Sequence, residues 1–124
     1  MEEKTNSEQL ANLIVAGMQE KKASDIVVLN LTKVKNAVAD YFIICTGNSD
    51  TQLDAISDSI EEVVYKEVKQ DPWHREGRQQ KEWVLLDYVD VVAHVFKKDR
   101  RDFFALEELW GDAEIVHVSS ETEA

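Results

Sequence analysis

Residues 83–96, with the sequence Trp-Val-Leu-Leu-Asp-Tyr-Val-Asp-Val-Val-Ala-His-Val-Phe, decide the fold of this chain. Most of these residues are β-branched, aliphatic or aromatic, a composition that favours a pleated sheet over a helix. The acidic segment from Asp87 to Asp90 divides the stretch into two strands joined by a short turn, which predicts an antiparallel hairpin. Neither strand alternates cleanly between apolar and polar residues. We therefore expect both faces of the hairpin to be covered, by helices or by a partner.

Three segments have the spacing of amphipathic helices, with apolar residues three and four positions apart: 7–22, 50–68 and 99–110. Thr5 or Asn6 is placed to cap the first helix. Ser49, followed by Gln52 three residues later, predicts a capping box at the start of the second helix. Pro72 prevents this second helix from continuing.

Further strands are predicted where β-branched and aromatic residues cluster: 25–31, 40–45 and 73–74, with an added extended segment expected within 112–118. The order helix, strand, strand, helix, three strands, helix contains a strand–helix–strand unit, which implies at least one parallel, right-handed crossover. Together with the hairpin, this order predicts an α/β (α+β) fold with a mixed sheet of about five strands flanked by helices.

At 124 residues, with 44% apolar and 31% charged side chains, the chain is expected to form a single domain over 1–124, with a core over about 7–112 and an extension or tail over 113–124. No run approaches the roughly 18 apolar residues of a membrane span, and the N-terminus lacks the pattern of a secretory signal. A single cysteine, Cys45, excludes an internal disulfide and fits a reducing compartment. We expect a cytoplasmic protein.

The chain carries 25 acidic and 14 basic side chains, a formal net charge of −11. Such a surface gains little from counterion release and is not expected to bind RNA or DNA extensively. It suits a basic protein partner, because complementary charge speeds encounter. Solubility alone is the alternative explanation of the charge.

Three groups of residues are candidate chemical sites. The turn at 46–49 could cradle a phosphate at a helix N-terminus, but it lacks the lysine of a P-loop, which favours a structural turn. Asp87 and Asp90 could hold a divalent metal for phosphoryl transfer, yet they straddle a turn and turn aspartates are common for local reasons. His94 and Cys45 have no neighbours at metal-ligand spacing, so neither a metal nor a cofactor is expected. Trp83 suits either a core or an interface.

Three ordered motifs resemble one known family, the Iojap-related ribosomal silencing factors. They are Ala-Asp-Tyr-Phe-Ile-Ile-Cys-Thr-Gly-Asn-Ser at 39–49, the hairpin at 83–96, and Arg101 followed by Leu-Glu-Glu-Leu-Trp at 106–110. The resemblance spans roughly residues 7–112. It implies a nucleotidyltransferase-like fold without its catalytic site, and therefore a protein that is not an enzyme.

The resemblance also implies a function. Members of this family bind large-subunit ribosomal protein fourteen (uL-fourteen), block joining of the small subunit and so repress translation, notably when nutrients are short. The binding surface is expected to include Trp83, Leu85, Asp87, Tyr88, Asp90 and His94, together with Phe104 and Glu107 from the last helix. In this role Trp83 and Leu85 are apolar anchors. The carboxylates of Asp87, Asp90 and Glu107 pair with basic side chains of the partner.

The sequence departs from the family pattern at two positions. Val89 stands where the family usually has glycine, which predicts a stiffer turn, and Phe104 stands where tyrosine is usual. Two other hypotheses stay open: a metal-dependent nucleotidyltransferase-like enzyme that uses Asp87 and Asp90, and a plain dimerisation module. The family often forms homodimers, so the hairpin could meet either a partner or a second copy.

Overall fold

The computed structural model describes residues 6–99 and 113–118. Within these residues the elements are, in chain order, α1 (Ser7–Glu20), β1 (Ser24–Asn30), β2 (Tyr41–Gly47), α2 (Asp50–Val68), β3 (His74–Glu76), β4 (Trp83–Asp87), β5 (Val91–Lys97) and β6 (Glu114–His117). The first two predicted helices and all the predicted strands are confirmed to within about three residues at each end. All but the first residue of the helix predicted over 99–110 lie outside the described residues, as do Phe104 and Glu107.

The strands form one mixed sheet with the order β3-β4-β5-β2-β1-β6. β2 and β5 are parallel, and every other neighbouring pair is antiparallel. The predicted parallel crossover is therefore the path from β2 through α2 to β5, while the predicted hairpin is β4–β5. The sheet has one strand more than the expected five, because the extended segment near the C-terminus pairs with β1 as β6.

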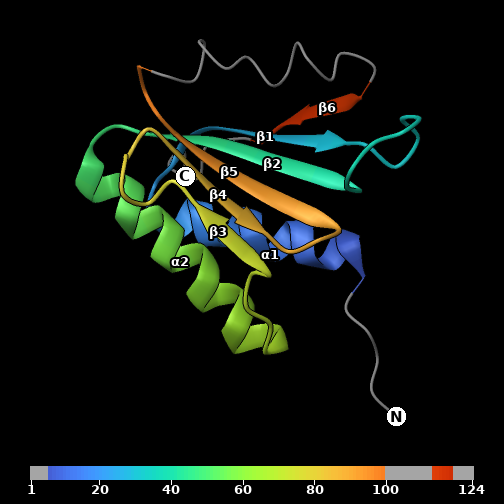
Figure 1. Ribbon diagram of the computed structural model, residues 1–124, viewed down its shortest axis with the longest axis horizontal. Coiled ribbons are helices and arrows are strands. Elements are labelled where there is room, and N and C mark those ends of the chain that lie inside the picture. Colours follow the sequence, from blue (N-terminus) through green and yellow to red (C-terminus); the bar gives the residue numbers. More distant parts are fainter. Residues whose placement is uncertain (1–5, 100–112, 119–124) are drawn as a thin grey trace.

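Both helices lie on the same side of the sheet (Figure 1). The side chain of Asn6 accepts a hydrogen bond from the amide of Gln9 (2.7 Å) and so caps α1. The hydroxyl of Ser49 caps α2 by accepting from the amide of Gln52 (3.1 Å). In a standard capping box, the side chain of Gln52 would accept a hydrogen bond from the amide of Ser49. Here it accepts from the amide of Asn48, one residue earlier (2.6 Å).

Gly17 lets the two helices approach each other closely. A Cβ atom at this position would lie 2.8 Å from the Cα of Ile60 in α2, a distance that real Cβ atoms do not adopt. The hydroxyl of Ser59 donates to the carbonyl of Gly17 (2.8 Å), which adds a polar tie at the same crossing. The pair of helices is thereby held as one layer over the sheet.

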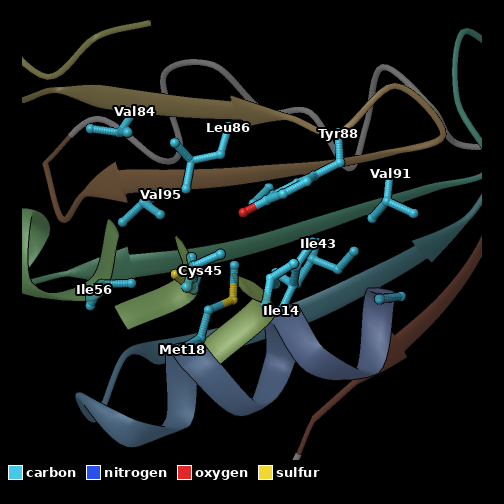
Figure 2. Packing of buried hydrophobic residues seen from close by; sticks show 14 of the residues in the cluster. Ile14, Met18, Ile43, Cys45, Ile56, Val84, Leu86, Tyr88, Val91 and Val95 are labelled. Carbon is cyan, nitrogen blue, oxygen red and sulfur yellow. The ribbon is translucent and has the colours of Figure 1, made fainter. Parts of the chain in front are cut away.

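The sheet buries a cluster of apolar side chains on each side. The helix face is the side covered by α1 and α2, and Figure 2 shows the packing there of Ile14, Met18, Ile43, Cys45, Ile56, Val84, Leu86, Tyr88, Val91 and Val95. The opposite side, which we call the Trp83 face, contains the buried residues Val27, Leu29, Leu31, Phe42, Ile44, Val92 and Phe96, with Trp83 and Leu85 packed against them.

The two strands of the hairpin differ in how well they are covered. From Val91 to Phe96, all side chains of β5 are buried, which confirms the expectation that both of its faces are covered. In β4, Val84 and Leu86 are buried but the alternate residues remain partly exposed. β4 is covered on one face only among the described residues, so part of the Trp83 face is open to solvent and is available to the partner that the same expectation allows. No helix among the described residues is long and apolar enough to cross a membrane.

A candidate partner-binding face on the sheet

The residues expected at the binding surface divide between the two faces of the sheet. Trp83, Leu85 and Asp87 alternate along β4, so they share the Trp83 face. The antiparallel register places His94 opposite Leu85 on this same side of the hairpin. Asp90 lies exposed in the turn that follows β4. The structure therefore brings five of the eight expected residues to one face or to its edge.

Tyr88 does not join this face. Its side chain is only 3% exposed and packs in the cluster of the helix face. Figure 2 shows the ring reaching from the hairpin turn into the core, with its hydroxyl oxygen pointing inwards. The hydroxyl has no hydrogen-bond partner, and burial raises the pKa of Tyr88 above its ordinary value. The expectation of a surface role is corrected here: two-residue periodicity points position 88 away from positions 83, 85 and 87.

Among the described residues, Phe96 and His94 both help to hold Trp83 in place. Its ring stacks on Phe96 with a centroid separation of 5.0 Å. Its indole N–H donates a hydrogen bond to Nδ1 of His94 over 2.9 Å. The side chain is nevertheless only half-buried, so it combines a fixed orientation with access to solvent. A large, partly exposed aromatic side chain with little freedom left to lose is typical of an interface anchor.

His94 acts on the surface through Trp83 and does not lie on the surface itself. It is 3% exposed, and burial lowers the pKa of His94 to about 3. An indole can only donate, so Nδ1 of His94 must be the acceptor and the neutral ring carries its proton on Nε2. That Nε2 group is buried without a hydrogen-bond partner. We conclude that His94 orients the indole of Trp83.

The start of β4 is fixed by an unusual close contact and by ion pairs. Gly77 has φ +91°, and a Cβ there would lie 1.9 Å from the carbonyl oxygen of Trp83. Within the loop that follows, the charged groups of Arg78 and Lys81 lie 3.2 Å and 3.0 Å from the carboxylate of Asp54 in α2. The hydrogen bond from Lys81 holds the pKa of Asp54 below its ordinary value. These contacts attach the loop before Trp83 to the helix layer.

The hairpin turn itself is strained. Val89 has φ +79°, a region that β-branched residues rarely adopt. The amide of Asp90 donates to the carbonyl of Tyr88 (3.0 Å), which makes a three-residue turn centred on Val89. The Asp87 carboxylate accepts from the amide of Val89 (2.7 Å) and so braces the turn. Valine at this position therefore leaves the turn closed but strained.

Two residues of the edge strand also border the Trp83 face, although sequence reasoning did not nominate them. The register pairs His74 with Asp87 and Glu76 with Leu85. The Nε2 atom of His74 lies 2.7 Å from the Glu76 carboxylate. The two-residue spacing of His74 and Glu76 was the available signal, but a three-residue strand is too short for a pattern to stand out.

The geometry of the described residues gives little support to the other candidate chemical sites, which are the metal site, the phosphate-binding turn and Cys45. Over 6–99 and 113–118, no group of three or more His, Cys, Asp or Glu residues is arranged to hold a metal ion. In the turn at 46–49, the amide of Asn48 is already bonded to Gln52, as expected for a structural turn. Cys45 is buried in the core. The arrangement on the Trp83 face is instead that of a contact surface: an oriented aromatic ring, a neighbouring leucine and carboxylates at the edge.

Comparisons with known proteins give a consistent result. The family model "Ribosomal silencing factor during starvation" matches residues 4–124. The ribosomal silencing factor of Bacillus subtilis is 41% identical over 116 residues, which cover 91% of this chain and 94% of that protein. The mouse protein "Mitochondrial assembly of ribosomal large subunit protein 1" is 27% identical over 118 residues, covering 90% of this chain and 51% of its own length. The crystal structure of a Chromobacterium violaceum protein matches with a TM-score of 0.79 at 30% identity, covering 94% of this chain and 97% of that one.

Proposed function

The chain belongs to the ribosomal silencing factor family, and we propose that it represses translation by binding uL-fourteen on the large ribosomal subunit and blocking association with the small subunit. The proposal is for a steric inhibitor, not an enzyme, and no cofactor is required. It places the protein in the cytoplasm, where ribosomal subunits join.

The oriented indole of Trp83 is the observation that carries this proposal. Binding normally costs entropy for every side chain that becomes fixed. In this protein, His94 and Phe96 already hold the ring before any partner arrives. Leu85 extends the apolar contact on the same face, while the carboxylates of Asp87 and Asp90 lie at its edge. An apolar centre with a charged rim is the usual anatomy of a protein interface.

The charge of the chain supports a basic protein, rather than ribosomal RNA, as the direct contact. With a formal net charge of −11, the protein repels phosphate groups at long range. A basic ribosomal protein on an otherwise anionic particle would be attracted to the carboxylates. A relative named for assembly of the large ribosomal subunit is consistent with a target on that subunit.

Co-sedimentation with separated ribosomal subunits tests the proposal directly. The purified chain is expected to sediment with large subunits and not with small subunits. When small subunits are added afterwards, fewer joined ribosomes should form than in the absence of the protein. Binding to neither subunit, or binding without any effect on joining, would refute the proposal. Sedimentation of the free chain measures whether it forms the homodimer that is common in the family. If the dimer uses the hairpin, dimerisation should compete with ribosome binding.

We expect Trp83→Ala to weaken binding to large subunits by at least ~2 kcal/mol, because it removes the central anchor of the face. Thermal melts recorded beside the titrations must show a cooperative transition, so that loss of binding is not loss of fold. Normal binding by a folded Trp83→Ala protein would contradict the assignment of this face.

A matched pair of charge variants tests the role of the rim. Asp90→Asn removes an exposed carboxylate beside the Trp83 face, whereas Glu62→Gln removes an exposed carboxylate from α2 on the other side of the sheet. Asp90→Asn should slow association and reduce the salt dependence of binding. Glu62→Gln should do neither, and equal effects of the two variants would show that only net charge matters.

A further inference from the structure

The most exposed large apolar side chains of the described residues are not among those that pack in the cluster of the Trp83 face. They are Trp73, Val38 and Val89, which are 75%, 72% and 57% exposed. Each comes from a different part of the chain: the link between α2 and β3, the loop between β1 and β2, and the β4–β5 turn. We refer to these three side chains as the Trp73 patch.

Main-chain hydrogen bonds bring these three segments to the same end of the sheet. The amide of Trp73 donates to the carbonyl of Asp87 (2.7 Å), two residues before Val89. The amide of Asp40, two residues after Val38, donates to the carbonyl of Asp90 (2.7 Å). The β4–β5 turn therefore lies between the other two segments and is bonded to both. Exposed apolar residues that gather from separate segments indicate a contact surface more strongly than scattered ones.

Burial in the core does not account for these three exposed side chains, although Ala37 and Ala39 beside Val38 do pack against the cluster of the Trp83 face. The ring of Trp73 has an exposed neighbour, the His74 ring, at a centroid distance of 5.9 Å. Val89 occupies a left-handed backbone position in which glycine would be unstrained. A valine that is both strained and exposed contributes little to stability, which points to a use for its side chain in a contact.

The charges around the patch are mainly negative. Asp87 and Asp90 flank Val89, and Asp71 precedes Trp73 by two residues. The guanidinium group of Arg75 does not offset these carboxylates, because it makes two hydrogen bonds to Glu61 at 2.8 and 2.9 Å. Lys33 and Lys35 lie in the loop that carries Val38, on the far side of the turn from Trp73.

We propose that the Trp73 patch is a second contact for the basic ribosomal protein that binds the Trp83 face, and that it receives a segment of that protein carrying an apolar side chain beside lysine or arginine. The identity of the partner rests on the proposed function. The two contacts are continuous through Asp87, whose side chain lies on the Trp83 face and whose carbonyl holds Trp73. A second copy of the chain is a poorer occupant, because two acidic surfaces would repel each other.

Binding of purified full-length variants to isolated large subunits tests this inference. Trp73→Ala should weaken binding roughly tenfold and Val89→Ala about threefold, as expected for an exposed anchor and a smaller neighbour. Val116→Ala is the matched control. Val116 is a valine of similar exposure (50%), but it lies on β6, at the opposite edge of the sheet. This variant should bind like the unmodified protein.

One further variant and one further measurement complete the test. Val89→Gly relieves the turn, so weaker binding by this more stable variant cannot be ascribed to unfolding, even if Trp73→Ala proves unstable. Sedimentation velocity of the free chain shows whether the same substitutions disrupt a dimer, a result that would overturn the proposal in favour of self-association. Unmodified protein that binds large subunits while the Trp73 and Val89 variants bind equally well refutes only this inference. Unmodified protein that does not bind refutes the proposed function and, with it, the partner named here.

Discussion

Replacing Val89 with glycine should make the protein more stable, although glycine normally destabilises folded proteins. At φ +79°, a residue with a Cβ atom carries strain of about 1–3 kcal/mol. Glycine removes this strain but adds about 0.5–1 kcal/mol of unfolded-state entropy. Because Val89 is 57% exposed, less than half of its side chain is buried. Removing the side chain therefore costs about 0.6 kcal/mol of hydrophobic stabilisation. At the middle of these ranges, the net gain is about 0.7 kcal/mol.

The order of glycine and alanine at this position is the sharper test. Val89→Ala also loses the valine side chain but keeps the strain, so it should be less stable than the unmodified protein by about 0.5 kcal/mol. Glycine should therefore exceed alanine by about 1 kcal/mol at position 89. At position 116, in the exposed strand β6, the usual order should return. Val116→Ala should be more stable than Val116→Gly.

Equilibrium unfolding in urea measures these differences. The slopes of the transitions should stay equal among the four variants, so that shifts in midpoint report stability. If Val89→Gly is less stable than Val89→Ala, the turn is not strained in the way argued here. The structural basis for a contact role of the Val89 side chain would then be lost as well.

Three further predictions concern buried groups. His94 takes up its proton at a pKa of 6.5 when unfolded and about 3 when folded, so unfolding binds a proton between these values and stability falls as the pH drops below 6.5. From pH 7 to 5 the loss is about 2 kcal/mol, and it should be absent in His94→Gln when urea midpoints are compared at both pH values. Tyr88→Phe removes a buried hydroxyl without a partner; unfolding midpoints should rise or stay level, and ribosome binding should not change. Gly17→Ala places a Cβ against the backbone of Ile60, so calorimetry should show a lower melting temperature in spite of the better helix propensity of alanine.

Sequence reasoning predicted the two described helices and the strands because their signals are local. The apolar spacing of α1 and α2, the Ser49–Gln52 pair and the β-branched residues of the hairpin each depend on neighbours within a few positions. The mixed sheet also followed from element order, since a helix between two strands requires a crossover. The sixth strand was only expected as an extended segment, because its partner β1 lies more than 80 residues earlier in the chain.

The sequence predicted which candidate residues share a side of the hairpin, but it did not predict that Tyr88 and His94 are buried. The motif places Trp83, Leu85 and Asp87 on one side of the hairpin, whereas Tyr88 was grouped with them because it is adjacent in sequence. In the structure, its ring fills the helix face. A strand places consecutive side chains on opposite faces, so neighbours in a motif are seldom neighbours on a surface.

The sequence by itself determined the family, the elements and the acidic charge, because motif, periodicity and composition can all be read along one dimension. Only the tertiary structure decided which side chains meet. It placed the Nδ1 atom of His94 within hydrogen-bond distance of the indole N–H of Trp83, and it bonded the segments that carry Trp73 and Val38 to the two ends of the strained turn at Val89. These contacts join segments distant in sequence. They depend on strand register and on which face of the sheet the helices cover, and neither is encoded at any single position.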